Sequence, residues 1–213
     1  MTKASMFVPP LYKAEDPAGI VDAYPFALLV TGQGGDIHAT ATPIFFERDD
    51  EQEFLVGHMA RRNAHAQSLA VGQSALAVFW GPHAYISSRW YAAKPEVPTW
   101  NYVQAQARGV LEPIDDPAEQ LAILKRTAQV LERRGEPPWT LDQAPEGRVE
   151  FLLPMIRSFR IRVTRLEGAT KLSQGHPPVD RMRVIAGLLA EDDGAARDIA
   201  RLMAALSTED FGS

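Results

Sequence analysis

Two stretches with a two-residue repeat constrain the fold of this chain more than any other feature. In residues 99–111, large aromatic and polar side chains alternate with mostly small or apolar ones. In residues 158–166, aromatic and branched apolar side chains alternate with arginine and threonine. A repeat of two is the period of a β-strand with one buried face. Both stretches are therefore predicted to be long strands of a sheet that encloses a core.

Shorter patterns fill in the rest of the predicted architecture. Apolar runs at 27–31, 37–46, 53–57 and 74–80 read as further strands; Gly81 and Pro82 close the last of these, and 84–87 reads as another strand. Helical patterns lie at 16–24 and 63–72, after Asp116, and at 149–153, 179–190 and 195–206. No strand–helix–strand rhythm repeats along the chain, so a doubly wound parallel sheet is not favoured. The expectation is a mainly β protein with peripheral helices (α+β): a small antiparallel barrel over residues 1–175 and a helical extension over 176–213 packed on it.

The composition of the chain argues against several classes of function. The chain of 213 residues has no cysteine, which excludes disulfides and thiolate chemistry, and its net charge of −5 argues against a wide nucleic-acid surface. No apolar run approaches the roughly 20 residues of a membrane span, and the opening MTKASMFVPP lacks the apolar segment of a signal peptide. The expected location is the cytoplasm, with no membrane partner.

The densest aromatic stretch, residues 85–102, predicts a site for a flat ligand. It carries tryptophan and tyrosine interspersed with hydroxyl, amide and charged groups, each of which costs free energy in a core unless it finds a partner. A flavin ring needs apolar walls and amide-like groups at its pyrimidine edge. Trp90, Tyr91, Trp100, Asn101 and Tyr102 are the candidates for the ring, with Ser87 and Thr99 at its edge. The alternative is ordinary packing inside a β-barrel.

Two further segments could complete such a site. Residues 57–62 read as a loop that places Arg61 and Arg62 just before a helix capped by Asn63, an arrangement suited to a phosphate. Residues 171–174, Lys-Leu-Ser-Gln, could close over a ligand from a second subunit. The alternatives are two solvated arginines and a solvated loop.

Other chemistries are not indicated. The five histidines form no metal-binding spacing, and Ser87 and Ser88 lack the surroundings of a serine nucleophile. The glycines of 32–35 lack the lysine of a phosphate-binding loop and read as a hairpin turn. We predict no metal ligand and no catalytic side chain.

Taken together, five segments resemble one family. They are MFVPPLY, GHMARRNAH, AVFWGPHAYISSRWY, VPTWNY and KLSQ, and the similarity extends from Met6 to about Leu189. The set resembles the PaiB-like proteins, which are described as FMN-binding negative transcriptional regulators. The resemblance implies a split β-barrel of the pyridoxamine-phosphate-oxidase type and a homodimer with FMN bound at the subunit interface.

The resemblance also implies roles for individual residues. Arg61 would contact the FMN phosphate, and His58 and Asn63 would shape its loop. The remaining implied cofactor residues are Tyr85, Ile86, Ser87, Ser88, Trp90, Tyr91, Thr99, Trp100, Asn101, Lys171, Ser173 and Gln174. Ser88 stands where the family usually has proline, and Gly175 stands where asparagine is common.

Three functions follow as hypotheses. The first is an FMN-binding regulator or flavin-dependent sensor, with DNA as a partner by family analogy only. The second is an FMN-dependent oxidoreductase in which the flavin takes hydride from a nicotinamide cofactor and reduces a small acceptor. The third is an interaction module with a vestigial pocket. On the first two hypotheses, Arg61→Ala should weaken FMN binding with little effect on folding.

Overall fold

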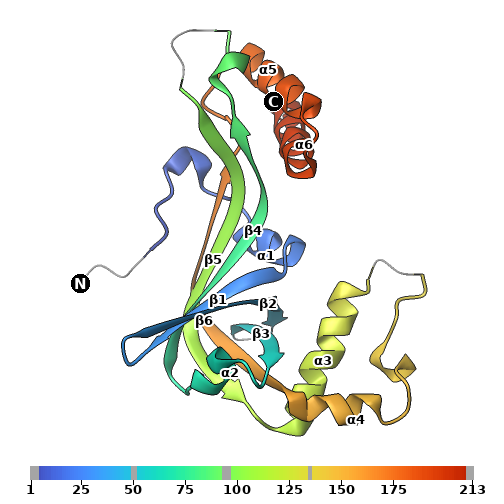
Figure 1. Cartoon of the computed structure of the whole chain (residues 1–213). Coiled ribbons are helices and arrows are strands. Elements are labelled where there is room, and N and C mark those ends of the chain that lie inside the picture. The colour runs from blue at the N-terminus through green and yellow to red at the C-terminus, as the bar shows by residue number, and fades with distance from the viewer. Residues whose placement is uncertain (1–4, 49–51, 93–96, 134–135, 210–213) are drawn as a thin grey trace. The chain divides into compact units, whose positions relative to one another are not determined.

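The computed structural model describes residues 5–48, 52–92, 97–133 and 136–209 (Figure 1). The chain divides into two compact units. One, called here the barrel unit, comprises Val21–Phe79 and Gln106–Leu166. The other, called the helical unit, comprises Met1–Ile20, Trp80–Ala105 and Glu167–Ser213. The predicted division at residue 175 stays a prediction.

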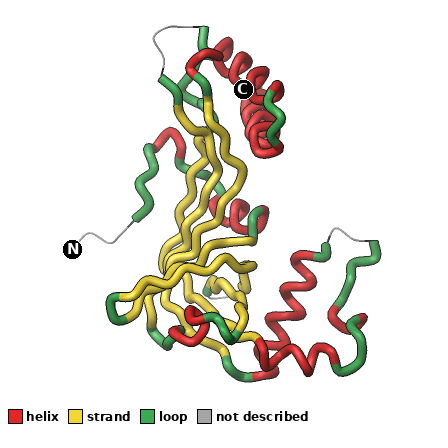
Figure 2. The backbone as a smooth tube through the Cα atoms, viewed as in Figure 1, coloured by secondary structure: helices red, strands yellow, loops and turns green. Residues whose placement is uncertain are grey.

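Six strands in the described residues close into a barrel in the order β1-β2-β3-β6-β5-β4. Their bounds are β1 Phe26–Gln33, β2 Asp36–Arg48, β3 Glu53–Ala60, β4 Gln73–Ile86, β5 Thr99–Ile114 and β6 Ile156–Lys171 (Figure 2). β2 pairs antiparallel with β1 and β3, β1 with β4, and β3 with β6. The predicted class, mainly β and antiparallel with peripheral helices, is confirmed.

The two alternating stretches behave as their period predicts. On β5, Asn101, Val103, Ala105 and Ala107 are buried, while Trp100 is exposed. On β6, Phe159 and Ile161 are fully buried, and Arg162 points outward. The predicted break after Trp80 is wrong, because β4 continues through Gly81 and Pro82 to Ile86. The exposed positions shift by one there, so that Trp80 and His83, three residues apart, both face outward.

Helices complete the barrel unit. α2 covers Ala64–Ser68, α3 covers Pro117–Leu131 and α4 covers Arg148–Leu152, while α1 covers Pro17–Ala23. The predicted start of α3 is confirmed, since the Asp116 carboxylate accepts hydrogen bonds from the backbone N–H groups of Ala118 and Glu119. Ile123 of α3 packs with Phe45 and Val56 outside the barrel.

The helical unit has its own core. α5 (Pro178–Ala190) and α6 (Gly194–Glu209) lie side by side (Figure 1), close to their predicted bounds. Val184 and Leu188 of α5 and Ile199 and Met203 of α6 are buried with Ile86 of β4. Four 3₁₀ turns lie in the described residues: η1 Pro10–Tyr12 and η2 Ser88–Trp90 in the helical unit, and η3 Leu141–Gln143 and η4 Leu153–Met155 in the barrel unit.

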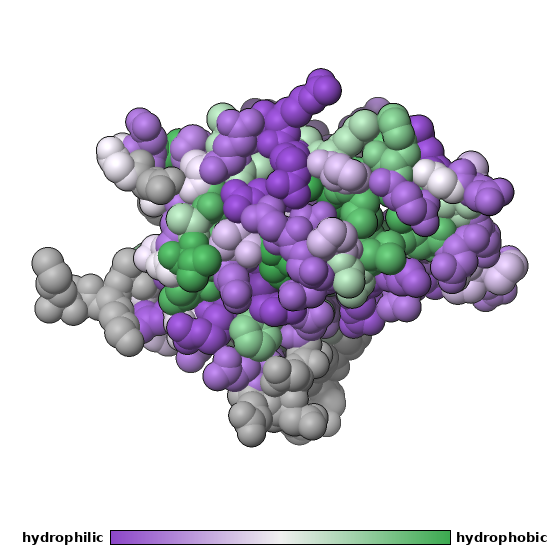
Figure 3. Space-filling model, turned by 90° about the horizontal axis from the view of Figure 1, so that it is seen from below, coloured by the Kyte–Doolittle hydropathy of each residue, from purple (hydrophilic) through white to green (hydrophobic). Residues whose placement is uncertain are grey.

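The helices of the described residues were compared in length and hydropathy with a membrane span. In the part of the chain that the structure describes, each helix is too short or too polar to cross a bilayer. Figure 3 shows apolar residues scattered among hydrophilic ones on one face of the molecule.

Candidate functional site

The predicted cofactor residues divide between the two units. His58, Arg61 and Asn63 belong to the barrel unit. All the others belong to the helical unit: Tyr85, Ile86, Ser87, Ser88, Trp90, Tyr91, Thr99, Trp100, Asn101, Lys171, Ser173 and Gln174.

The predicted loop at residues 57–62 is wrong for most of its length. β3 continues to Ala60, because its backbone pairs with β6 in the register His58↔Ser158 and Ala60↔Ile156. The following helix is also shorter than expected, ending at Ser68 rather than near Gly72. The chain is extended again at Leu69, whose carbonyl, with that of Ala66, accepts hydrogen bonds from Nη1 of Arg157.

Arg61 lies in a corner of the barrel unit and is partly engaged there. Its Nε donates to the carbonyl oxygens of Pro154 and Ile156 at 3.1 and 3.0 Å, and its Nη1 contacts the Asp115 carboxylate at 3.1 Å. Asp115 also binds Arg157 at 2.7 Å. The hydrogen bond from Arg157, followed by that from Arg61, lowers the pKa of Asp115 below its ordinary value. These bonds fix the guanidinium plane of Arg61 and leave Nη2 without a partner among the described residues.

A pocket of about 570 Å³ opens beside this corner. It is lined by Arg61 and Arg62 together with Gln67 and the apolar residues Ala60, Pro154 and Met155. Arg62 is exposed, and no side chain in the described residues pairs with it. With Asp115 shared by Arg61 and Arg157, the pocket wall keeps an excess of positive charge, which favours an anionic ligand.

Asn63 is the N-cap of α2, as predicted. Its Oδ1 accepts the backbone N–H of His65 at 3.0 Å, and its Nδ2 donates to Oγ1 of Thr40. The imidazole of His65 is buried between the hydroxyls of Thr31 and Thr40, at 3.0 and 2.9 Å. Burial, with a smaller effect of nearby His38, lowers the pKa of His65 to about 4. Asn63 therefore holds the start of α2, and its amide is already engaged in the single chain.

His58 on β3 is half-buried. Burial lowers the pKa of its imidazole, and its Nδ1 has no hydrogen-bond partner among the described residues.

In the helical unit, Lys171 is brought close to Thr99. Its Nζ donates to Oγ1 of Thr99 at 2.6 Å and lies 5.6 Å from the centre of the Tyr12 ring. Removal from water lowers the pKa of Lys171, and no carboxylate in the described part of the chain pairs with it. A partly buried ammonium group without an anion is a second place where a negatively charged or carbonyl-bearing ligand would be stabilised.

Hydrogen bonds within the chain hold the predicted segment 171–174 in place. Nδ2 of Asn101 donates to Oγ of Ser173 at 2.9 Å and contacts Sδ of Met203 at 3.4 Å. Ser173 has a positive φ of 61°, and Gln174 accepts a hydrogen bond from the Leu172 N–H at 2.7 Å. Asn101, Ser173 and Gln174 thus shape the turn that follows Lys171, the last residue of β6. The Oδ1 atom of Asn101 is buried without a partner among the described residues.

Four other predicted residues of the helical unit are buried or half-buried. Ile86 and Tyr91 are buried in the core formed with α5 and α6. Ser87 caps η2, its Oγ accepting the Arg89 N–H at 3.3 Å, and Ser88 opens that turn.

An exposed aromatic face is the most unusual surface of the helical unit. Trp80, Tyr85 and Trp100 are 51%, 50% and 53% exposed. The His83 ring joins them: its centre lies 6.3 Å from that of Trp80 and 6.0 Å from that of Trp100, and the Tyr85 ring lies 6.0 Å from Trp100. Trp80 and His83 are absent from the predicted site. Reading residues 73–86 as one strand would have placed His83 on the face of Tyr85, whereas Trp80 shares that face only because of the shift at Gly81 and Pro82.

Comparison with known proteins identifies the family. Residues 6–165 match the family described as "Putative FMN-binding domain". The chain is also 33% identical to the protease synthase and sporulation protein PAI 2 of Bacillus subtilis over 203 residues, covering 93% of this chain and 96% of that protein. This chain belongs to the PaiB-like FMN-binding family. The resemblance inferred from the five motifs is therefore confirmed.

Solved structures share the fold of this PaiB-like chain. The flavocytochrome Anf3 from Azotobacter vinelandii has a TM-score of 0.55 at 18% identity, covering 74% of this chain and 67% of that one. The conserved hypothetical protein Rv2991 from Mycobacterium tuberculosis has a TM-score of 0.50 at 17% identity, covering 83% and 94%.

FMN is the cofactor that membership of this family assigns, and the residues of the PaiB-like chain fit it. The pocket beside Arg61 and Arg62 offers guanidinium donors for a phosphate. The aromatic face and Lys171 offer flat apolar surface and a cation for a ring that carries carbonyl groups.

Proposed function

We propose that this protein is a homodimeric split-barrel flavoprotein that binds FMN at its subunit interface and serves as a flavin-dependent sensor in transcriptional regulation. The observation that supports it most strongly is the half-exposed aromatic face of a chain that belongs to an FMN-binding family.

The phosphate of FMN is assigned to the corner of Arg61 and Arg62. Nη2 of Arg61 is held in place by the bonds that Nε and Nη1 make to Pro154, Ile156 and Asp115. A donor that is already oriented loses little conformational entropy when a phosphate binds. Arg62 adds a second charge that is exposed in the free chain.

The aromatic face is assigned to the subunit interface, where it would meet a flavin ring whose phosphate is held by the second subunit. Large aromatic side chains bury roughly 150–250 Å² each when covered, so leaving Trp80, Tyr85 and Trp100 half in water is costly. A contiguous exposed patch of this kind marks an interaction surface. β1 pairs with β4 only between Ala75 and Phe79, so the stretch of β4 that bears this face lies beyond that pairing.

Bound FMN supplies two-electron redox chemistry, and the chain binds, orients and shields it.

The arginines of α5 and α6 favour a sensor over a protein that reads DNA directly. Arg183 donates to the Trp90 carbonyl at 2.7 Å, Arg197 pairs with Asp192 at 3.1 Å, and Arg201 pairs with Asp198 at 2.7 Å. A recognition helix presents unpaired basic groups to phosphates. We infer that regulation passes through another contact of the dimer.

The test is the visible spectrum and mass of the purified protein. Flavin absorption, with a dimer mass in light scattering after reconstitution with FMN, is the expected result. A colourless monomer that takes up no FMN would refute the proposal and favour the interaction-module hypothesis.

Replacing Arg62 should weaken FMN binding without affecting folding. Arg62→Ala is expected to raise the dissociation constant of FMN about tenfold, from the loss of one charge-assisted bond of about 1.5 kcal/mol.

Arg61→Ala should weaken FMN binding further but also lower the unfolding free energy, because Arg61 holds three groups of the fold. This corrects the expectation that folding would tolerate Arg61→Ala. Fluorescence titration measures the FMN affinity, and urea unfolding measures the stability. Unchanged FMN affinity in both variants would show that the phosphate does not bind at Arg61 and Arg62.

Two measurements separate the sensor from its alternatives. Rapid bleaching of the bound flavin by a reduced nicotinamide cofactor without oxygen would assign an oxidoreductase. A mobility shift with upstream DNA at low salt would assign direct repression, and no shift is expected.

A further inference from the structure

Arg157 of β6 joins two segments that line the pocket beside Arg61 and Arg62, called here the phosphate corner. Its side chain is only 17% exposed, and each of its three guanidinium nitrogens donates a hydrogen bond within the barrel unit. Nε and Nη2 bind the Asp115 carboxylate, and Nη1 binds two backbone carbonyl oxygens near the end of α2. Arg157 is not among the residues that line the pocket, so any effect on a ligand must pass through these partners.

The bonds to Asp115 fix the orientation of Arg61. Nε of Arg157 lies 3.0 Å from Oδ1 of Asp115, and Nη2 lies 2.7 Å from Oδ2, which makes a bidentate pair. Such a pair sets the plane of a carboxylate as well as its position. Oδ1 of the same carboxylate accepts the hydrogen bond from Nη1 of Arg61 at 3.1 Å. Because the Asp115 side chain is 49% exposed, it would rotate in water without Arg157, and Arg61 would lose a fixed partner.

The bonds to the backbone fix a second wall of the same pocket. Nη1 of Arg157 lies 2.7 Å from the carbonyl oxygen of Ala66 and 3.3 Å from that of Leu69. Gln67 stands between these two residues in the sequence, and it lines the pocket together with Arg61. One guanidinium group therefore ties two sides of the phosphate corner to β6.

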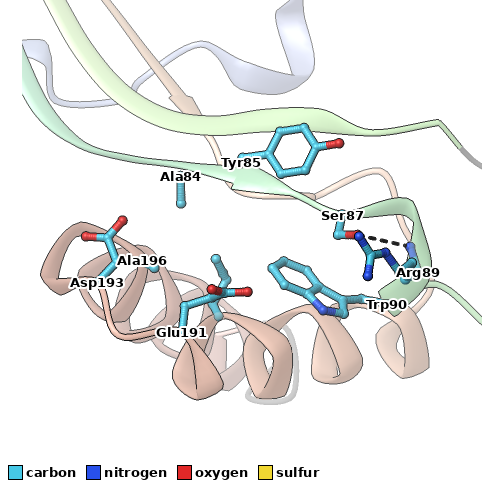
Figure 4. Close-up of a pocket in the computed structure, with 9 residues that line it drawn as sticks. Ala84, Tyr85, Ser87, Arg89, Trp90, Glu191, Asp193 and Ala196 are labelled. Carbon is cyan, nitrogen blue, oxygen red and sulfur yellow. Dashed lines mark hydrogen bonds between the residues drawn. The ribbon is translucent and has the colours of Figure 1, made fainter.

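Two other arginines show what is particular to Arg157. Arg160, three residues further along β6, pairs with Glu47 at 3.2 Å and does not line the phosphate corner. Arg89 lines a different pocket, of about 290 Å³ in the helical unit, where its exposed guanidinium group has no partner among the described residues (Figure 4). Of these three arginines, Arg157 is the one that links two walls of one pocket.

We propose that Arg157 is the positioning residue of the phosphate corner: it orients Arg61 through Asp115 and thereby sets the preference of this protein for a phosphorylated flavin over an unphosphorylated one. The inference rests on the proposed function, because that function assigns the phosphate of FMN to Arg61. A donor that is already oriented loses little conformational entropy when its ligand binds. Loosening Arg61 therefore weakens the contribution of the phosphate and leaves the contacts of the ring as they are.

The preference is measured as the ratio of the dissociation constants of riboflavin and FMN, which differ only in the phosphate. The natural protein is expected to bind FMN at least about tenfold more tightly, the value of one charge-assisted hydrogen bond. Fluorescence titration gives both constants, and urea unfolding of the flavin-free protein gives the stability of each variant. Equal binding of the two flavins by the natural protein would refute the phosphate assignment and this inference with it.

Asp115→Asn separates positioning from charge. The substitution removes a negative charge beside the phosphate corner, which on charge alone would favour FMN and raise the ratio. It also replaces the bidentate acceptor of Arg157 with an amide that has one acceptor oxygen. We expect the ratio to fall about fivefold, within the range of coupling between neighbours in one hydrogen-bond network. A raised or unchanged ratio in this variant would overturn the proposal.

Arg157→Lys tests the same link from the other side. Lysine keeps the charge but has no planar fork of donors, so the ratio should again fall about fivefold. Arg160→Lys is the matched control, the same change in an ion pair of the same strand, and it should leave the ratio unchanged. An equal fall in the two lysine variants would show general loosening of β6 and overturn the proposal. A natural protein that prefers FMN, with Asp115→Asn and Arg157→Lys that keep this preference, would refute the inference and leave the phosphate assignment standing.

Discussion

Replacing Gly109 with alanine should lower the unfolding free energy of the protein by about 3 kcal/mol, the upper part of the range for overpacked positions. Gly109 lies on β5, where a Cβ would overlap the backbone carbonyl oxygen of Arg162 and lie 2.5 Å from Cγ2 of Ile161 on β6. A flexible side chain could move aside, but a backbone carbonyl of a neighbouring strand cannot do so without opening the barrel. Urea unfolding of the FMN-free protein measures the loss.

Gly32→Ala is the matched control for this prediction. Gly32 also lies on a barrel strand, β1, but the nearest atom to its added Cβ is the Asp36 carbonyl oxygen at 3.7 Å, an ordinary contact. The control should be neutral or slightly stabilising, because alanine restricts the unfolded chain more than glycine does. Equal destabilisation by the two substitutions would show that the contact between β5 and β6 at Gly109 is not tight.

Acidification from pH 7 to pH 5 should cost about 2 kcal/mol of unfolding free energy through His65 alone. Its pKa is about 4 in the folded protein, against an ordinary value of 6.5 for a solvated histidine. Because the folded pKa is lowered, this stability is present above pH 6.5 and is lost as the pH falls toward 4, where the unfolded chain binds a proton that the folded chain does not. His58, whose pKa burial also lowers, acts in the same direction.

The variant His65→Gln should be less stable at pH 7 but should lose much less stability on acidification. Urea unfolding at the two pH values measures both. A His65→Gln variant with the same pH dependence as the natural protein would show that another group is responsible.

Most of the secondary structure could be predicted because it depends on neighbours in sequence. The alternation in residues 99–111 and 158–166 follows from the geometry of a strand, and the start of α3 follows from Asp116 and Pro117. The secondary-structure predictions failed where pairing with a strand distant in sequence decided the structure. Residues 57–60 look like a loop because glycine and histidine carry no strand pattern, yet β6 pairs with them and extends β3 through Ala60.

The candidate site was less predictable than the fold. The motifs named Arg61, Lys171 and Asn101, but not what each would contact. The pairing of Arg61 with Asp115 joins residues far apart in sequence, and it changes the expected effect of mutating Arg61. Trp80 and His83 were missed because the glycine and proline between them suggested a strand end.

The sequence by itself determined the family, the β-rich class and the places of the main helices, since periodicity and motif spacing are properties of the chain. Only the tertiary structure decided which of the singled-out side chains are engaged within one chain and which remain available. Asn101 and Asn63 are bonded within their own units, while Trp100 and Arg62 face outward. The physical reason is that these contacts join residues far apart in sequence, whereas a local pattern gives only the face of the strand on which a side chain lies.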